Sequence, residues 1–163
     1  MSNVLFISDL HLGHENIMKF SSEHRAGSDI TEHDAWIVER WNSVVRPKDV
    51  VYLLGDVAFT PTGLTSIARL NGRIKLLRGN HDEFSTAIYS ELFDDLLPGL
   101  FKYKEFWLSH CPIHPAELRG RRNIHGHVHH KSIPDDRYIN VCVEPLRGAP
   151  ISLDQIRSAV EAP

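Results

Sequence analysis

Short apolar runs that alternate with amphipathic stretches constrain the fold of this chain more than any other feature. Five runs predict β-strands: residues 4–7, 50–54, 74–77, 106–108 and 139–143. Strands that alternate with helices are typical of βαβ units, in which parallel strands form an inner sheet and helices cover it. The sequence therefore predicts an α/β fold with a mostly parallel inner sheet.

The first helix has the clearest sequence signals. Thr31 and Asp34 have the spacing of a capping box, which predicts the start of a helix. Apolar residues then recur at helical spacing at Ile37, Trp41, Val44 and Val45, and Pro47 lies beyond the expected end. We expect this helix to cover one face of the sheet.

Three further helices and one hairpin are also predicted. The helices cover residues 64–70, 85–92 and a stretch through residue 160 that begins after Ser152 and Gln155. Residues 100–109 can form two strands around Lys104 and Glu105, although neither residue favours a tight primed turn. No internal repeat or linker interrupts the pattern, so we expect one domain over residues 1–163.

Charge and cysteine content exclude several function classes. The chain has 163 residues with 18 Lys+Arg against 21 Asp+Glu, a net charge of −3, so no bulk positive field favours nucleic acid or anionic lipid. Its two cysteines form no C-x-x-C motif or disulfide framework. The sequence shows no signal peptide or long apolar run. We therefore expect a cytoplasmic protein with no membrane partner.

Histidine is concentrated in one part of the chain. Six of the 11 histidines lie between positions 110 and 130: His110, His114, His125, His127, His129 and His130. Histidine has no helix or strand preference that explains such clustering, whereas imidazole is the commonest metal ligand near neutral pH. Solvent exposure would explain any one of these residues, but the cluster indicates a metal site.

Residues with metal-binding side chains follow the apolar runs directly, at four separate points of the chain. Because ligands of open α/β sheets gather beyond the carboxyl ends of the strands, we expect these residues to converge. Alternate residues of an extended segment point to the same face, so donors at i and i+2 can serve one centre. The candidate ligands are Asp9, His11, Asp56, Asn80, His110, His127 and His129.

This donor set predicts two ions rather than one. Four imidazoles, two carboxylates and one amide exceed the coordination of a single ion, whereas two ions about 3.5–4 Å apart can share a carboxylate. Nitrogen-rich, sulfur-free coordination suits Mn, Fe, Zn, Co or Ni better than Ca or Mg. Such a centre favours an anionic substrate and a two-metal hydroxide mechanism at phosphorus. His81 beside Asn80 is the candidate acid for the leaving group.

Glycines precede three of the candidate ligands. Gly55, Gly79 and Gly126 stand where the backbone is expected to turn sharply or approach an ion closely.

The imidazole ligands must be neutral to bind metal, so we expect activity to fall below roughly pH 6.

Five motifs occur in the order found in one known family. They are Asp9-x-His11, Gly55-Asp56, Gly79-Asn80-His81-Asp82, His110 and Gly126-His127-x-His129. In these residues the chain resembles the calcineurin-like metallophosphoesterases, and its opening motif is similar to that of small bacterial and phage members. The resemblance implies a four-layer α-β-β-α sandwich with a two-metal site at the strand ends.

The resemblance also implies individual roles. Asp9, His11, Asp56 and His129 would hold one metal, and Asn80, His110 and His127 would hold the other together with Asp56. Asp56 would then bridge the ions, which makes it a catalytic residue with His81, the motif histidine that contacts phosphate. Manganese is the favoured metal of those named above.

The leading interpretation is a phosphoesterase that acts on diesters, and also on monoesters, of a small nucleotide-like or aryl substrate. Val-Ala-Phe-Thr-Pro follows Asp56, where protein phosphatases have Asp-Arg-Gly, so a phosphoprotein substrate is not expected. One alternative is a non-catalytic metal-binding scaffold, but such a protein should have lost ligands or His81. The other is a nuclease acting on DNA or RNA, which should have a basic groove.

The sequence leaves several questions open, including the native metals, the preference for monoester or diester, and the oligomeric state. We expect Cys111 to be a small packing residue. It does not decide the roles of His14, His125, Arg78, Arg121 and Arg122.

Overall fold

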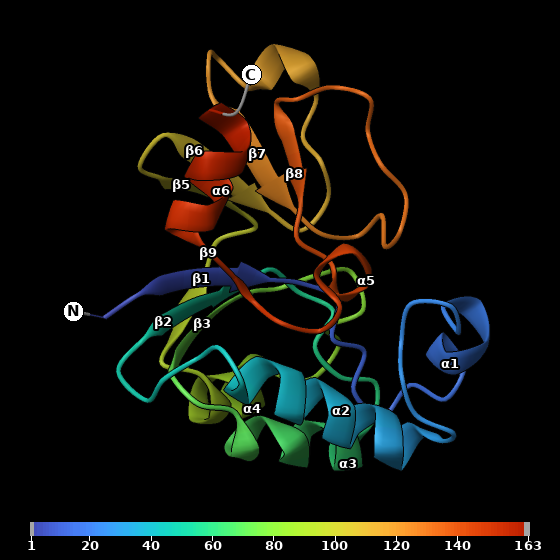
Figure 1. Cartoon of the computed structure of the whole chain (residues 1–163). Coiled ribbons are helices and arrows are strands. Elements are labelled where there is room, and N and C mark those ends of the chain that lie inside the picture. The colour runs from blue at the N-terminus through green and yellow to red at the C-terminus, as the bar shows by residue number, and fades with distance from the viewer. Residues whose placement is uncertain (1, 162–163) are drawn as a thin grey trace.

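A five-stranded sheet forms the centre of the computed structural model, which describes residues 2–161 (Figure 1). Its strand order is β4-β3-β2-β1-β9. The strands are β1 (Val4–Ile7), β2 (Val50–Leu53), β3 (Arg73–Leu77), β4 (Asp95–Leu97) and β9 (Ile151–Ser152). The first four are parallel, and β9 pairs antiparallel with β1. The predicted parallel inner sheet is confirmed, while β4 and β9 were not predicted.

A second sheet of four strands packs against the first. It has the order β5-β6-β7-β8, with strands β5 (Leu100–Tyr103), β6 (Phe106–Ser109), β7 (Arg122–His125) and β8 (Tyr138–Asn140). The predicted hairpin over residues 100–109 is confirmed, since β5 and β6 are antiparallel and Lys104 adopts the left-handed conformation with φ 51°. Strands β6, β7 and β8 are parallel, and β7 was not predicted.

The prediction of a strand over residues 139–143 was wrong at its C-terminal end. Strand β8 ends at Asn140, whose side chain accepts a hydrogen bond from the Cys142 N–H at 2.9 Å. The chain then crosses to the first sheet, where Ser8 N–H donates to the Val141 carbonyl at 2.8 Å. Val143 begins the short helix α5 (Val143–Leu146). The run is apolar because it passes through the cores on both sides of the first sheet, not because it is one strand.

Helices cover the outer face of the first sheet. They are α2 (Ile30–Asn42), α3 (Pro61–Thr65) with the 3-10 turn η1 (Ser66–Arg69), and α4 (Thr86–Leu92). In Figure 1 these helices lie below the sheet, and the second sheet and α6 (Leu153–Glu161) lie above it. The short helix α1 (Ile17–Phe20) stands to one side, next to the segment that follows β1.

Two apolar cores hold these layers together. Ile37, Trp41, Leu64 and Tyr89 pack under the first sheet, and each is nearly inaccessible to solvent. The core between the sheets contains Phe6, Tyr52, Leu54, Leu77, Phe106, Leu108 and Ile124, closed at one side by Leu153 and Ile156 of α6. Burial of side chains of this size contributes roughly 1.5–3 kcal/mol each.

The fourth layer is thin. On the second sheet Trp107 and Asn123 alternate with core residues and so face outward. Trp107 donates to the Leu118 carbonyl at 3.1 Å, and the Asn123 side chain accepts from the Ile113 N–H at 3.0 Å. The outer layer is therefore the segment that contains one 3-10 turn, η2 (Pro115–Glu117). The predicted α-β-β-α order of layers is confirmed in this reduced form.

Helix α2 starts and ends earlier than predicted. Its cap is Asp29, which accepts from the Glu32 N–H at 2.9 Å, rather than Thr31. Asp34 instead accepts from the Gly13 N–H at 2.9 Å, a long-range contact that the capping-box spacing could not reveal. The helix ends at Asn42, although Val45 beyond it is still buried in the core.

The remaining helix predictions hold in part. The helix predicted over 64–70 begins at Pro61 with Thr60 as its cap, and its last turn is 3-10. Helix α4 begins after Ser85 as predicted. The predicted helix near the end of the chain is α6, and Ser152 and Gln155 exchange two capping hydrogen bonds at its start, at 2.9 and 3.2 Å. Among the described residues the longest helix has 13 residues, and no helix is long and apolar enough to cross a bilayer.

Candidate active site

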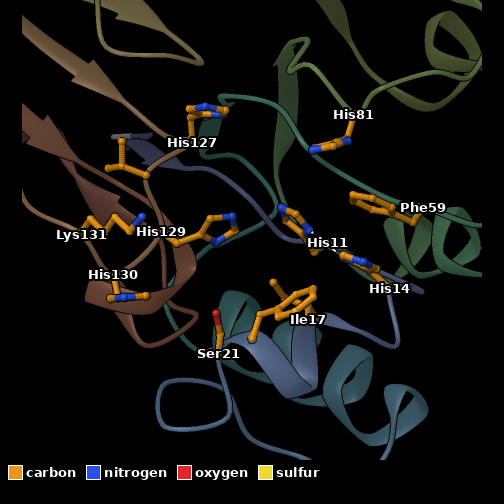
Figure 2. Close-up of a pocket in the computed structure, with 12 residues that line it drawn as sticks. His11, His14, Ile17, Ser21, Phe59, His81, His127, His129, His130 and Lys131 are labelled. Carbon is orange, nitrogen blue, oxygen red and sulfur yellow. Dashed lines mark hydrogen bonds between the residues drawn. The ribbon is translucent and has the colours of Figure 1, made fainter.

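The candidate ligands lie in loops at the carboxyl ends of strands from both sheets. Asp9 and His11 follow β1, Asp56 follows β2 and Asn80 follows β3. The second sheet contributes His110 after β6, and His127 and His129 after β7. The structure brings all seven residues together at one end of the sandwich. Figure 2 shows three of them, His11, His127 and His129, with His81 at the same pocket.

One group of donors contains Asp9, His11 and His129. The Nε2 atoms of His11 and His129 lie 3.7 and 3.9 Å from Asp9 Oδ1. Asp9 Oδ1 and His11 Nε2 are buried and have no hydrogen-bond partner among the described residues. Leaving buried polar atoms unpaired costs about 1–3 kcal/mol each, so two such atoms that face each other indicate a cation site. A transition-metal ion bound at about 2.0–2.2 Å from each donor fits this gap.

A second group contains Asn80, His110 and His127. His110 Nε2 lies 2.9 Å from Asn80 Oδ1 and 3.2 Å from His127 Nδ1. Asp56 Oδ2 lies 3.4 Å from His110 Nε2 and 3.7 Å from His11 Nε2, so the same oxygen faces both groups. The donors thus fit two ions with Asp56 between them.

The backbone of these loops is strained at the candidate ligands. Among the described residues, eight non-glycine residues have positive φ, and five of the eight are candidate ligands. They are Asp9 (62°), His11 (53°), Asp56 (52°), His127 (70°) and His129 (53°). Each such residue costs roughly 1–2 kcal/mol, and strain of this kind concentrates at functional sites. The strain gives a second observation, independent of the donor types, that marks this cluster as functional.

Two of the predicted glycines are required by close approach rather than by a left-handed turn. A Cβ atom on Gly126 would overlap Asp9 Oδ2, and one on Gly79 would overlap Asp56 Oδ1. Both glycines therefore let the backbone pass directly beside a candidate carboxylate ligand.

Hydrogen bonds from outside the donor set orient it. The ring N–H at His110 Nδ1 donates to the Leu54 carbonyl at 2.7 Å, which leaves Nε2 free to bind metal. Asp9 Oδ2 accepts from the His127 N–H at 2.9 Å and from Cys142 Sγ at 3.2 Å, so only Oδ1 remains free. These contacts turn Asp9 Oδ1 and His110 Nε2 toward the other candidate ligands.

Sequence reasoning missed a buried ion pair behind the first donor group. His129 Nδ1 donates to Glu144 Oε1 at 3.0 Å, and the same oxygen lies 2.8 Å from Arg25 Nη2. Arg25 also donates to the carbonyls of Asp9 at 2.6 Å and Leu10 at 2.9 Å. The pair thereby fixes both the β1 loop and the His129 ring. No sequence signal marks Arg25 or Glu144, because both lie outside the motifs.

We expect Glu144→Gln to lower the metal affinity of the Asp9–His11–His129 group about 10- to 100-fold, because His129 loses the carboxylate that orients it. Calorimetric titration with Mn²⁺ measures this effect. The control is Glu117→Gln, since Glu117 is exposed and forms its ion pair with Arg119 on the surface. Unchanged affinity in Glu144→Gln would show that Glu144 does not position His129.

Asp82 links two of the loops. Its carboxylate accepts from the N–H groups of Asp56 at 2.8 Å, Val57 at 2.9 Å and Gly79 at 2.7 Å. Burial of this side chain and three backbone hydrogen bonds fix the ends of β2 and β3 relative to each other. Its place in the motif with Asn80 and His81 was visible in the sequence, but this role was not.

His81 differs from the candidate ligands in its surroundings. It is exposed, its ring faces the pocket, and its backbone N–H donates to Asp56 Oδ1 at 2.9 Å (Figure 2). Its ring centroid lies 6.2 Å from that of His11. This is a suitable place for a side chain that meets the substrate rather than the metal.

The structure also places the residues whose roles were open. His14 lines the pocket, with Nδ1 3.0 Å from His11 Nδ1 and its ring stacked on Phe59. His125 is buried, hydrogen-bonds the Gly126 carbonyl, packs against Tyr138 and belongs to none of the metal-binding groups found among the described residues. Histidine spacing alone could not separate these two residues from the candidate ligands.

The three arginines lie outside the pocket. Arg78 binds the carbonyls of Asp82 and Phe84 and stacks on Tyr89, Arg121 binds the Lys104 carbonyl, and Arg122 pairs with Asp136. Contacts outside the pocket therefore engage Arg78, Arg121 and Arg122.

The prediction that Cys111 is a packing residue was wrong. Cys111 is exposed, and its Sγ lies within 4.8 Å of nitrogen atoms of His110 and His127. Partial burial and the charges of Asp56 and Asp9 raise the pKa of the thiol, which disfavours the thiolate needed to bind metal. Cys111 therefore borders the second donor group.

The chain is similar to several known proteins in sequence and in fold. The sequence model of the calcineurin-like phosphoesterases matches residues 2–143. The uncharacterized protein MJ1445 of Methanocaldococcus jannaschii is 34% identical over 99% of this chain and 93% of its own length. The crystal structure of AQ665 from Aquifex aeolicus, a protein of unknown function, has a TM-score of 0.78 at 27% identity and covers 98% of this chain and all of its own. A nuclease of Pseudomonas putida, MPE, shares the fold with a TM-score of 0.54 at 20% identity, over 77% of this chain and 61% of its own.

Proposed function

This chain belongs to the calcineurin-like phosphoesterase family, and we propose that it is a metal-dependent phosphodiesterase acting on small nucleotide-like or aryl esters. The single observation that carries the proposal is the pair of donor groups that face Asp56 Oδ2 from two sides, at 3.4 and 3.7 Å. A centre of two divalent ions fits them.

The residues divide into ligands and a proton donor. We propose that Asp9, His11 and His129 hold one ion, that Asn80, His110 and His127 hold the other, and that Asp56 joins both. When bound, the ions supply Lewis-acid chemistry that makes water a stronger nucleophile and neutralises charge on the phosphate. The donors contain nitrogen and oxygen, which supports Mn²⁺ and also suits Fe, Zn, Co and Ni.

His81 is proposed to hydrogen-bond the phosphate and to donate a proton to the leaving oxygen. Its exposed ring at the pocket wall supports this role, because the group that leaves must be reached from the solvent side of the ligands. The Asp56 carboxylate that binds the His81 N–H keeps this residue beside the centre.

Diester preference, location and domain organisation are part of the same proposal. The pocket holds a single Lys or Arg among its described residues, Lys131, which suits one phosphate group better than a chain of them.

The cysteines Cys111 and Cys142 are free thiols, in accord with a reducing cytoplasm. The single domain over residues 1–163 stays a prediction.

A rate comparison tests the function. Protein stripped of metal with a chelator and reloaded with Mn²⁺ should hydrolyse bis(p-nitrophenyl) phosphate faster than p-nitrophenyl phosphate, and the stripped protein should hydrolyse neither. Hydrolysis that is independent of metal, or no hydrolysis of either ester by the reloaded protein, would contradict the proposal.

Metal affinity should begin to fall at a higher pH than the sequence predicts. Burial lowers the pKa of His110, but its contacts with Asp56 and Asp9 outweigh burial and raise the pKa to about 8. Glu144 also raises the pKa of His129, whereas burial lowers that of His11 and His127. Because metal binds the neutral ring, affinity is full above the His110 pKa and falls as protons compete below it. The pH at which metal affinity begins to fall therefore moves from the roughly pH 6 expected from the sequence toward about pH 8.

We expect the affinity of the His110 group to fall about tenfold per pH unit below that onset, because each ion displaces one proton. Titration with Mn²⁺ in buffers of different protonation enthalpy measures both the affinity and the proton released. Constant affinity from about pH 8 down to about pH 6, with no proton released, would contradict the assignment of His110 as a ligand.

A further inference from the structure

A pocket of about 590 Å³ extends from the candidate metal centre toward α1 (Figure 2). One wall carries His11, His81, His127 and His129, and the rest includes Ile17 and Phe20 of α1, Phe59 after β2, and Lys131. This volume lies in the range of sites that bind whole small molecules, so it holds more than a phosphate group. The ester groups of the substrate must occupy the remaining space.

Phe59 lies beside the reacting groups. Its ring centroid is 4.9 Å from that of His11, 5.1 Å from that of His81 and 4.0 Å from that of His14. In Figure 2 its ring lies between His81 and His14 at the edge of the pocket. His14 stacks on one face of this ring, so an ester group on a phosphorus atom bound between His11 and His81 meets the part of Phe59 that His14 does not cover.

Phe20 is the most exposed of the large hydrophobic side chains in the described part of the chain, at 71%. Ile17, one turn earlier in α1, is buried at 3%, so α1 is anchored by one residue while it presents the other to solvent. Phe20 lines the same pocket as Phe59. An exposed aromatic ring that borders a catalytic pocket is typical of a surface that binds an apolar or planar ligand group.

The charge of the pocket limits what that group can be. Lys131 supplies one positive charge, and Arg78, Arg121 and Arg122 are engaged elsewhere. A strand of nucleic acid or a nucleoside triphosphate would need several cations along its phosphates. A small diester with one planar ring needs only the centre, one cation and an aromatic surface.

We propose that Phe20 and Phe59 form a ring-binding subsite, which takes the nucleobase or aryl ring of one ester group and so determines substrate specificity. This inference rests on the proposed phosphodiesterase function. The two rings bind the ligand by stacking, which depends on the flat face of the ring and not on hydrogen bonds to a particular base. The subsite should therefore favour planar rings in general over alkyl groups.

The test compares the binding of two diesters to Mn²⁺-loaded protein by calorimetry. The probes are thymidine 5′-methyl phosphate and dimethyl phosphate, which share the charge and have alkyl leaving groups that react slowly. Wild-type protein should bind the thymidine ester more tightly. Phe20→Ala should weaken that binding about tenfold, the usual effect of removing one stacking ring, and leave dimethyl phosphate unchanged. Phe20→Tyr, which keeps an aromatic ring, should bind the thymidine ester as tightly as wild type does.

The matched control is Leu100→Ala, which removes another exposed apolar side chain, at 45% exposure, from a strand outside the pocket. It should change neither affinity. Equal affinity of the wild type for both esters, or equal weakening of both by Phe20→Ala, would overturn the subsite. The proposed function has its own readout, because wild-type protein that fails to hydrolyse bis(p-nitrophenyl) phosphate would refute it whatever the calorimetry shows.

Discussion

Asp56→Asn should lower kcat/KM for a phosphodiester by about a thousandfold or more, because one substitution weakens both metal positions. The Oδ2 atom of Asp56 is the oxygen that faces His110 at 3.4 Å and His11 at 3.7 Å. An amide has nearly the same shape but no charge, so it is a poor bridge between two cations. Metal analysis of the purified variant should show reduced occupancy of both ions, together with the loss of rate.

The fold should tolerate this change. The amide oxygen introduced by Asp56→Asn can still accept the hydrogen bond that Asp56 Oδ1 receives from the His81 N–H at 2.9 Å. Burial raises the pKa of Asp56, as does the Asp9 charge, but contacts with His110 and the His81 N–H outweigh them and lower it. A pKa that is lower in the folded state means that the charged carboxylate stabilises the metal-free fold, so thermal melts of metal-free Asp56→Asn should be modestly lower than those of wild type, with the protein still folded. Asp95→Asn, at an exposed carboxylate on β4, is the matched control. Full occupancy of both ions in Asp56→Asn would refute the bridge.

His81→Ala should retain both metal ions but lower kcat about 10²- to 10⁴-fold on esters whose leaving group needs a proton. The effect should be much smaller with a p-nitrophenyl leaving group, because that anion leaves without protonation. Rates on phenyl and p-nitrophenyl esters of the same phosphate, with metal content measured in parallel, separate the two cases.

His130→Ala is the control for this experiment, because His130 lines the same pocket, is exposed, and lies outside both donor groups. It should leave the dependence on the leaving group unchanged. An equal loss of rate on both esters by His81→Ala would indicate a role in binding phosphate without proton transfer. Loss of metal from the variant would mean that His81 acts as a ligand.

Local patterns predicted the parts of the fold that local forces determine. Strands β1, β2 and β3 follow from short apolar runs. The helix after Ser152 follows from the local pair Ser152 and Gln155, whose side chains cap its start. The predicted capping box at Thr31 and Asp34 was wrong because the Asp34 carboxylate accepts a long-range hydrogen bond from the Gly13 N–H. Asp29 caps the helix instead. Short strands at the sheet edges, such as β4 and β9, depend on pairing that no local pattern shows.

The candidate site could be assembled from sequence because its residues occupy the loops after the strands, where topology brings them together. What the sequence could not show is how the donors are held. The Arg25–Glu144 pair behind His129 and the Cys142 contact to Asp9 depend on long-range packing. The left-handed backbone at Asp9, His11 and Asp56 is likewise a tertiary effect, since no glycine occupies those positions.

The central claim is that this chain holds two cations in one cluster, joined by the Asp56 carboxylate. The most direct test is to load metal-free protein with excess Mn²⁺ in the presence of phosphate, count the ions by elemental analysis and locate them by anomalous diffraction. We expect two ions per chain, one beside Asp9, His11 and His129 and one beside Asn80, His110 and His127, with Asp56 in contact with both. A single ion, or none, under these conditions would contradict it.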